Sequence, residues 1–174
     1  VGYGAIGREI AQRAVGFGMK IVAVDAHPAA DAPHVAEVWP SARLLDLMAA
    51  SDIVMVAAPY TKESHHMLDA PAFAAMRPGG YVIVVSRGGI VDEAALADAL
   101  ASGHLAGAGI DVAEREPLPD DSRFWDLPNV ILTPHLAGSS TQKERRCVEI
   151  LRENILHLQR GEPLVNVVDK QLGY

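Results

Sequence analysis

The chain has 174 residues, about the length of one domain, so we expect a single domain rather than a complete two-domain enzyme. Asp and Glu number 22 against 15 Lys and Arg, and the resulting charge of −7 argues against a nucleic-acid-binding surface. The one cysteine excludes an internal disulfide, and no apolar run approaches the roughly 20 residues that cross a bilayer. We expect a soluble, cytoplasmic protein without nucleic-acid or membrane partners.

The chain opens on a glycine motif. Gly2, Gly4 and Gly7 form G-x-G-x-x-G with only Val1 in front of them. Because this motif normally follows a strand, we expect the first strand of the sheet to be largely missing and its neighbours to be left partly unpaired.

Strands and helices alternate along the rest of the chain. A helix follows the glycines and ends near Gly16 and Gly18, a strand buried on both faces covers 20–25, and 27–40 is irregular. The later elements, in order, are a helix capped by Ser41, a buried strand at 52–58, a short helix at 71–76, a strand at 81–85, a helix at 92–103, strands at 105–112 and 130–132, and a long amphipathic helix at 139–159. This alternation predicts an α/β fold with a Rossmann-type doubly wound parallel sheet.

The glycine motif predicts a nucleotide site. Gly2 would make the tight turn, Gly4 would let a pyrophosphate approach the backbone, and Gly7 would let the helix pack closely on the strand. Ala5 and Ile6 lie at the start of that helix, whose free N–H groups and dipole attract phosphate.

Asp25 ends the strand that follows this helix, 18 residues beyond Gly7. A carboxylate there would accept hydrogen bonds from the adenosine ribose and repel a 2′-phosphate, which favours NAD over NADP. The alternative is a structural glycine turn with a solvated aspartate.

Arg87, Glu116 and His135 each follow one of three successive predicted strands. Ligands of parallel sheets bind at the carboxyl ends of the strands, so we expect the three side chains to share one crevice. A guanidinium can hold a carboxylate, an imidazole can move a proton and a carboxylate can orient the imidazole. This set suits reduction of a 2-oxo acid. Taken singly, each residue could instead be a surface ion-pair partner, a solvated carboxylate or a helix cap.

Three segments carry a family resemblance. They are S-R-G-G-I-V-D-E-A-A-L at 86–96, G-I-D-V-A-E-R-E-P-L at 109–118 and N-V-I-L-T-P-H-L-A-G at 129–138. With the glycine motif, they resemble the D-2-hydroxyacid dehydrogenase family from residue 1 to about residue 169. The chain departs from the family pattern at Val84, where Asn is frequent, at Ala113, where Phe is frequent, and at Ala5, where a basic residue is frequent. None of these departures removes a charged or titratable group from the set.

The resemblance implies roles for individual residues. Arg87 would bind the substrate carboxylate and carbonyl, His135 would be the general acid/base, and Glu116 would be its hydrogen-bonded partner. Asp111 would hold the nicotinamide carboxamide, and Pro59 would be a further cofactor contact. His65 and His66 are adjacent, but no suitably spaced Cys or acidic ligand accompanies them, so we expect no metal site.

The resulting hypothesis is an NAD-dependent oxidoreductase that acts on a small (R)-2-hydroxy acid or its 2-oxo acid. The alternative is an NAD-sensing regulatory module, similar to the corepressors that resemble this family. Residues 1–138 would form the dinucleotide-binding domain, and 139–174 the crossover helix and tail that belong partly to a substrate domain. The resemblance places most of that domain upstream of Val1, so we expect no measurable catalysis by these residues alone. For the full-length form we expect a homodimer.

Overall fold

The computed structural model describes residues 1–29, 31–171 and 173. The chain divides into two compact units, Val1–His135 and Leu136–Tyr174, which are described separately. Residues 172 and 174 of the expected tail lie outside the described residues.

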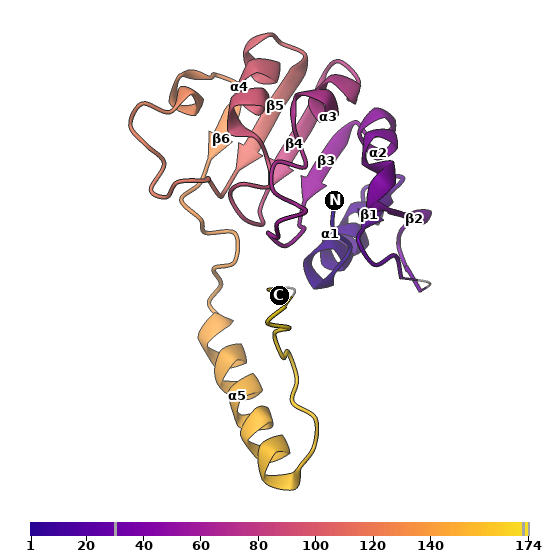
Figure 1. Cartoon of the computed structure of the whole chain (residues 1–174), viewed down its shortest axis with the longest axis vertical. Helices are drawn as coiled ribbons and strands as arrows, with labels where there is room; N and C mark the ends of the chain where they lie inside the picture. Colours follow the sequence, from indigo (N-terminus) through magenta and orange to yellow (C-terminus); the bar gives the residue numbers. More distant parts are fainter. Residues whose placement is uncertain (30, 172, 174) are drawn as a thin grey trace. The chain divides into compact units, whose positions relative to one another are not determined.

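The first unit is built on parallel strands (Figure 1). A four-stranded sheet runs in the order β3 (Ile53–Val56), β4 (Gly80–Val84), β5 (Leu105–Ile110) and β6 (Val130–Leu132). A second, two-stranded sheet pairs β1 (Val22–Asp25) with β2 (Glu37–Pro40). Sequential parallel strands joined by helices confirm the predicted α/β fold.

Val1 and Gly2 join the two sheets. The Val1 nitrogen donates to the Met55 carbonyl at 2.7 Å, and the Ala57 N–H donates to the Val1 carbonyl at 2.8 Å. On the other side, the Gly2 N–H donates to the Val24 carbonyl at 2.8 Å. These two residues therefore occupy the position between β1 and β3 where a doubly wound sheet has its first strand.

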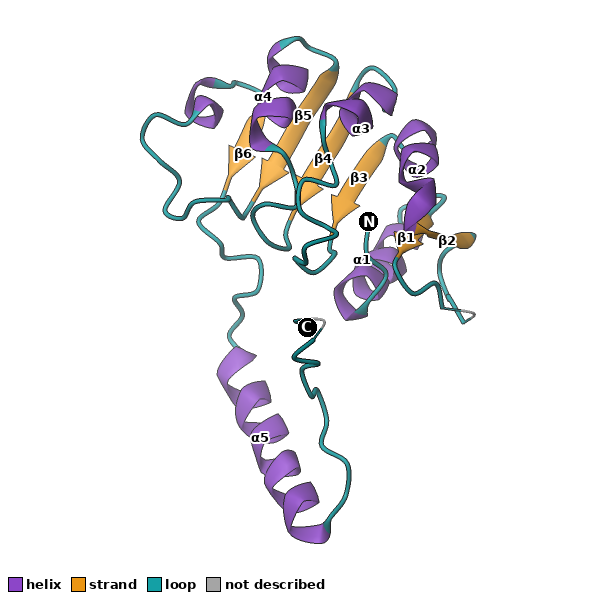
Figure 2. Ribbon diagram, in the orientation of Figure 1, coloured by secondary structure: helices purple, strands orange, loops and turns teal. Residues whose placement is uncertain are grey.

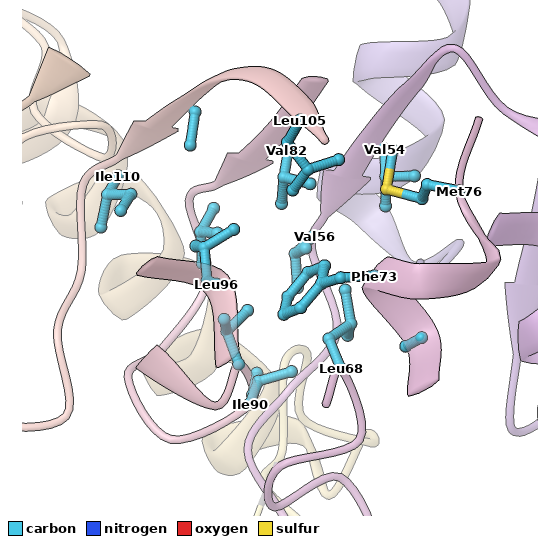
Figure 3. Packing of buried hydrophobic residues seen from close by; sticks show 14 of the residues in the cluster. Val54, Val56, Leu68, Phe73, Met76, Val82, Ile90, Leu96, Leu105 and Ile110 are labelled. Atoms are coloured by element: carbon cyan, nitrogen blue, oxygen red, sulfur yellow. The ribbon is translucent and has the colours of Figure 1, made fainter. Parts of the chain in front are cut away.

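The described residues of this unit include the α-helices α1 (Ala5–Val15), α2 (Leu44–Ala50), α3 (Ala70–Ala75) and α4 (Glu93–Ala101). Asp69 and Asp92 cap α3 and α4 by accepting from the backbone N–H groups of Ala72 and Ala95. Neighbouring helices α2, α3 and α4 contact one another along the sheet (Figure 2). Between them and the sheet lies the main core, which includes Val54, Val56, Leu68, Phe73, Met76, Val82, Ile90, Leu96, Leu105 and Ile110 (Figure 3).

The prediction that the strand at 52–58 is buried on both faces was wrong, whereas in β1 the adjacent residues Ala23 and Val24, which point to opposite faces, are both buried. In β3 and β4 the buried residues alternate with partly or fully exposed ones. Exposed positions include Ile53, Tyr81 and Ile131, the last with 72% of its surface accessible. Because side chains alternate across a strand, helices on one face cover only every second residue, and within this unit the opposite apolar face stays exposed.

Three local expectations also need correction. Residues 37–40, expected to be irregular, form β2, because parallel pairing with β1 supplies hydrogen bonds that local sequence does not reveal. Ser41 begins a 3₁₀ turn, Ser41–Arg43, without a side-chain cap. Another 3₁₀ turn, Arg123–Asp126, lies between β5 and β6, where no helical element was expected.

The second unit contains α5 (Lys143–Arg160), which starts four residues later than the predicted 139. Gly161 ends it in a left-handed conformation, with φ of 67°. The Asn154 side chain holds the following segment by accepting from the Val165 N–H at 2.8 Å and donating to its carbonyl at 3.1 Å. No helix among the described residues is long and apolar enough to span a membrane.

Candidate active site and cofactor site

The glycine turn is sterically constrained at two of its three glycines. Gly2 has φ of +84°, and a Cβ on it would lie 2.6 Å from the Ala58 nitrogen. A Cβ on Gly7 would lie 2.2 Å from the Gly2 carbonyl oxygen. Larger residues at either position would displace the backbone, so these glycines allow α1 to start directly against the strand position of Val1 and Gly2.

Gly4 is different, because no atom lies within 4 Å of the position its Cβ would take. It is also the N-cap of α1, and no side chain caps the first N–H groups of that helix. Ala5 and Ile6 therefore begin a helix whose N-terminal backbone is open to an anion. An open approach and uncapped donors are the features that a dinucleotide pyrophosphate needs at such a turn.

Asp25 lies beside this turn at the end of β1. Its Oδ2 accepts from the Tyr3 N–H at 2.7 Å, and its Oδ1 accepts from the His27 N–H at 2.8 Å. The two backbone bonds hold the carboxylate in place, and each oxygen keeps a second lone pair for a ribose hydroxyl. Arg8, which the sequence reasoning did not consider, lies 4.9 Å from the centre of the Tyr3 ring and donates to the Asp31 carbonyl.

His135 and Glu116 are in direct contact at the carboxyl edge of the sheet. Nδ1 of His135 lies 2.8 Å from Oε2 and 3.0 Å from Oε1 of Glu116. The His135 N–H also donates to the Asp111 carbonyl at 2.8 Å, which fixes the residue just after β6. The His135 hydrogen bond, the Ala113 N–H and the positive charge of Arg87 hold the pKa of Glu116 below its ordinary value.

Arg87 follows β4 at the same edge, and its Nη1 donates to the Ser86 carbonyl at 2.8 Å. Its next neighbour, Gly88, packs against the loop after β5, where an added Cβ would lie 1.9 Å from the Ala113 carbonyl oxygen. Arg87, Glu116 and His135 thus come from three neighbouring strands to one edge, as their sequence positions predicted.

The two other expected cofactor residues occupy the same edge. Asp111 is buried at the end of β5, its backbone N–H bonds the Val84 carbonyl at 3.0 Å, and its carboxylate accepts from the Thr133 hydroxyl. The carbonyl of Pro59, in the loop after β3, accepts from the Ser64 hydroxyl at 2.9 Å.

Ser86 was not singled out by the sequence reasoning. Its hydroxyl is buried and has no hydrogen-bond partner in the described part of the chain. It stands between β4 and Arg87, beside the end of β5. A buried hydroxyl without a partner is unfavourable, so its place here fits a polar ligand at this edge, such as the nicotinamide end of the cofactor.

Sequence reasoning also missed an ion pair. With no metal site expected, the sequence assigned His66 no role, yet its Nε2 contacts Oε1 of Glu114, 48 residues away. Only the folded order of the strands brings the two together, and no local pattern signals such a pair. Among the described residues, no group of three or more His, Cys, Asp or Glu side chains is arranged to hold a metal ion.

Comparison with known proteins defines the class. Residues 1–137 match the family model of the D-isomer specific 2-hydroxyacid dehydrogenase, NAD binding domain. The chain therefore belongs to the D-isomer specific 2-hydroxyacid dehydrogenase family and contains its NAD-binding domain.

Individual relatives narrow the comparison. The chain is 38% identical to a glyoxylate reductase of Korarchaeum cryptofilum, over 99% of this chain and 52% of the relative. It is also 38% identical to a D-3-phosphoglycerate dehydrogenase of Bacillus subtilis, over 97% of this chain and 32% of the relative. The chain thus spans about half the length, or less, of these curated relatives.

Solved structures give the same result. A D-isomer specific 2-hydroxyacid dehydrogenase from Xanthobacter autotrophicus Py2, in complex with NADPH and MES, superposes with a TM-score of 0.90 at 36% identity, over 99% of this chain and 54% of that one. An NADPH-dependent glyoxylate/hydroxypyruvate reductase from Sinorhizobium meliloti, in complex with NADP and sulfate, superposes with a TM-score of 0.91 at 34% identity. The match covers 99% of this chain and 55% of that one.

Proposed function

We propose that this chain is the cofactor-binding part of an enzyme that interconverts a small (R)-2-hydroxy acid and its 2-oxo acid. The observation that carries the proposal is the contact of His135 with Glu116, 2.8 Å between Nδ1 and Oε2, at the strand edge that Arg87 shares. An oriented imidazole beside a guanidinium provides a proton donor and a carboxylate anchor. Family membership supports this reading.

The contact with Glu116 determines which nitrogen of His135 exchanges a proton with substrate. A carboxylate only accepts hydrogen bonds, so Nδ1 carries the hydrogen and Nε2 is left for the substrate oxygen. In reduction, protonated Nε2 gives its proton to the carbonyl oxygen of the 2-oxo acid. In oxidation, neutral Nε2 takes the hydroxyl proton. Glu116 stays ionised through either direction, because its pKa lies below the ordinary value.

Arg87 would hold the substrate carboxylate through two parallel hydrogen bonds and keep C2 at transfer distance. When bound, the nicotinamide supplies the hydride in reduction and accepts it in oxidation. The glycine turn and the start of α1 would bind the pyrophosphate, and Asp25 the adenosine ribose. Asp111 and Pro59 would contact the nicotinamide half.

Several finer assignments belong to the proposal. Asp25 supports NAD as the preferred cofactor, although related structures hold NADPH or NADP. The names of relatives support small acids such as glyoxylate as the substrate class. We also propose a cytoplasmic homodimer in the full-length form, without nucleic-acid or membrane partners, in which residues 139–174 belong partly to the substrate domain.

The test is turnover by the full-length protein. NADH oxidation is followed with a panel of 2-oxo acids that includes glyoxylate and hydroxypyruvate, and the chirality of the product is determined. We expect (R)-products from at least one acid and a fall in kcat of about 100-fold or more for His135→Ala. Tight NADH binding without turnover of any acid would instead favour the alternative, an NAD-sensing regulatory module.

A further inference from the structure

The ion pair between His66 and Glu114 has no part in the proposed reaction. His66 lies in the loop after β3 and Glu114 in the loop after β5, and their side chains meet through Nε2 and Oε1. Both side chains are more than a third exposed, at 37% and 39%, so their pairing is not a by-product of core packing. The pair crosses the carboxyl edge of the sheet and links two of the loops that form the candidate site.

His66 stands on a firmly held backbone. Its N–H donates to the Gly89 carbonyl at 2.8 Å, and Leu68 and Val91 form a parallel bridge just beyond. The Leu68 N–H bonds the Ile90 carbonyl at 3.2 Å. The loop after β3 is thus joined to the segment that follows Arg87, and this segment holds the backbone of His66 in place.

Glu114 belongs to the loop after β5, which also carries Glu116. Its N–H donates to Oε1 of Glu93, at the start of α4, at 2.7 Å. One residue earlier, the Ala113 N–H donates to Oε1 of Glu116 at 3.1 Å. Anything that fixes Glu114 therefore also fixes the segment from which Glu116 reaches His135.

We propose that His66 and Glu114 form an electrostatic latch that holds residues 113–116 in place, so that Glu116 meets His135 in the orientation needed for proton transfer. His66 is then a positioning residue that acts through Glu114. This role rests on the proposed dehydrogenase function, and it ties the geometry of the acid/base pair to the charge of a second histidine.

The surroundings of His66 favour its charged form. Glu114 faces it from the loop after β5, Asp92 and Glu93 from the start of α4, and the His65 ring stacks on it at 4.0 Å. The hydrogen bond to Glu114 raises the pKa of His66 above the ordinary 6.5, and the three carboxylates add to this. The latch is therefore complete below pH 6.5 and weakens as the pH rises through the raised pKa.

The experiment compares His66→Gln and Glu114→Gln with wild type in the full-length protein. His34→Gln is the matched control, because His34 is exposed and, like His66, has a left-handed backbone, with φ of 71° against 49° for His66. We expect kcat/KM for 2-oxo-acid reduction to fall about tenfold at about pH 6 in both latch variants. A loss of this size is what a small displacement of the acid/base pair would cause. The ratio to wild type should approach one at about pH 9, and the double variant should lose no more than either single one.

A loss that is the same at every pH would overturn the latch, because a merely structural role does not follow the charge of His66. So would a double variant whose loss is the product of the two single losses. The His34→Gln control should match wild type at both pH values.

A second measurement does not depend on turnover. NMR titration of the His66 ring in wild type and in Glu114→Gln should show a lower pKa in the variant, because the principal cause of the raised pKa is removed. An identical titration in both proteins would overturn the latch, whatever the enzyme does. If wild type reduces no 2-oxo acid, the proposed function fails while this titration still tests the pair.

Discussion

Oε2 of Glu116 lies 2.8 Å from Nδ1 of His135, although 19 residues separate them in the chain. The two follow neighbouring parallel strands, β5 and β6, whose register sets Ile110 beside Leu132. The pairing of these strands therefore brings the Glu116 carboxylate to Nδ1, which places the hydrogen of the neutral imidazole on that nitrogen.

Glu116→Gln should change the pH dependence of reduction. The carboxylate stabilises a protonated imidazole, and the amide removes that charge while keeping much of the shape. Since reduction needs a proton on His135, we expect the alkaline limb of the kcat/KM profile to move to lower pH. Initial rates across a pH series test this, and an unmoved limb would show that Glu116 does not support the acid form.

The Glu116 carboxylate also has a predictable link to stability. Its pKa is depressed in the folded protein, so its contribution is present above the ordinary value of 4.5 and is lost as the pH falls through the lower, folded value. The difference in Tm between wild type and Glu116→Gln should therefore shrink on acidification below pH 4.5. A constant difference in thermal scans from neutral to acid pH would contradict this.

Arg87→Lys should impair both substrate binding and turnover. An ammonium keeps the charge but cannot reproduce two parallel hydrogen bonds to a carboxylate. We expect a raised KM together with a lower kcat, and a fall in kcat/KM of about 100-fold. Arg123→Lys, at an exposed ion pair with Asp98, is the control and should behave as wild type. Full activity of Arg87→Lys would remove Arg87 from the carboxylate site.

Asp25→Asn tests cofactor choice. We expect wild type to bind NAD at least about tenfold more tightly than NADP, a difference of about 1.4 kcal/mol, because the carboxylate repels a 2′-phosphate. The amide keeps an acceptor oxygen for a backbone N–H and removes the charge. The difference in affinity between NAD and NADP should therefore be smaller in Asp25→Asn than in wild type. Calorimetric titration with both cofactors measures the two dissociation constants. Equal values in wild type would refute the role of Asp25 in selecting NAD. Asp25→Ala would additionally break the bonds to Tyr3 and His27, so a lower Tm is expected there.

Gly4→Ala and Gly7→Ala should separate cofactor binding from folding. A methyl on Gly4 meets no atom of the chain, so stability should be unchanged while NADH affinity falls about tenfold, because the methyl obstructs the pyrophosphate. A methyl on Gly7 would lie 2.2 Å from the Gly2 carbonyl and should lower the free energy of unfolding by about 1–3 kcal/mol. Thermal scans and NADH fluorescence titrations test the pair. Gly4→Ala with normal affinity would contradict the nucleotide site.

Much of the fold was accessible from local patterns. Apolar spacing located the four core strands, and Asp92 marked the start of α4, because helices, caps and turns depend on residues close in sequence. The segment at 37–40 carries no such signal, and only pairing with β1 made it a strand. Exposure of Ile53 and Tyr81 escaped prediction for a similar reason, since an apolar run does not say which of its faces a helix will cover.

The candidate site divides in the same way. The sequence by itself determined the chemical groups and their strand ends: three glycines before a helix, Asp25 after the next strand, and an arginine, a glutamate and a histidine after three more. Tertiary structure alone decided the contacts among them, including the bonds of Asp25 to Tyr3 and His27 and the contact of His66 with Glu114. The physical reason is that such contacts join loops whose proximity depends on strand order and register, and these are set by the packing of the whole sheet rather than by any one segment.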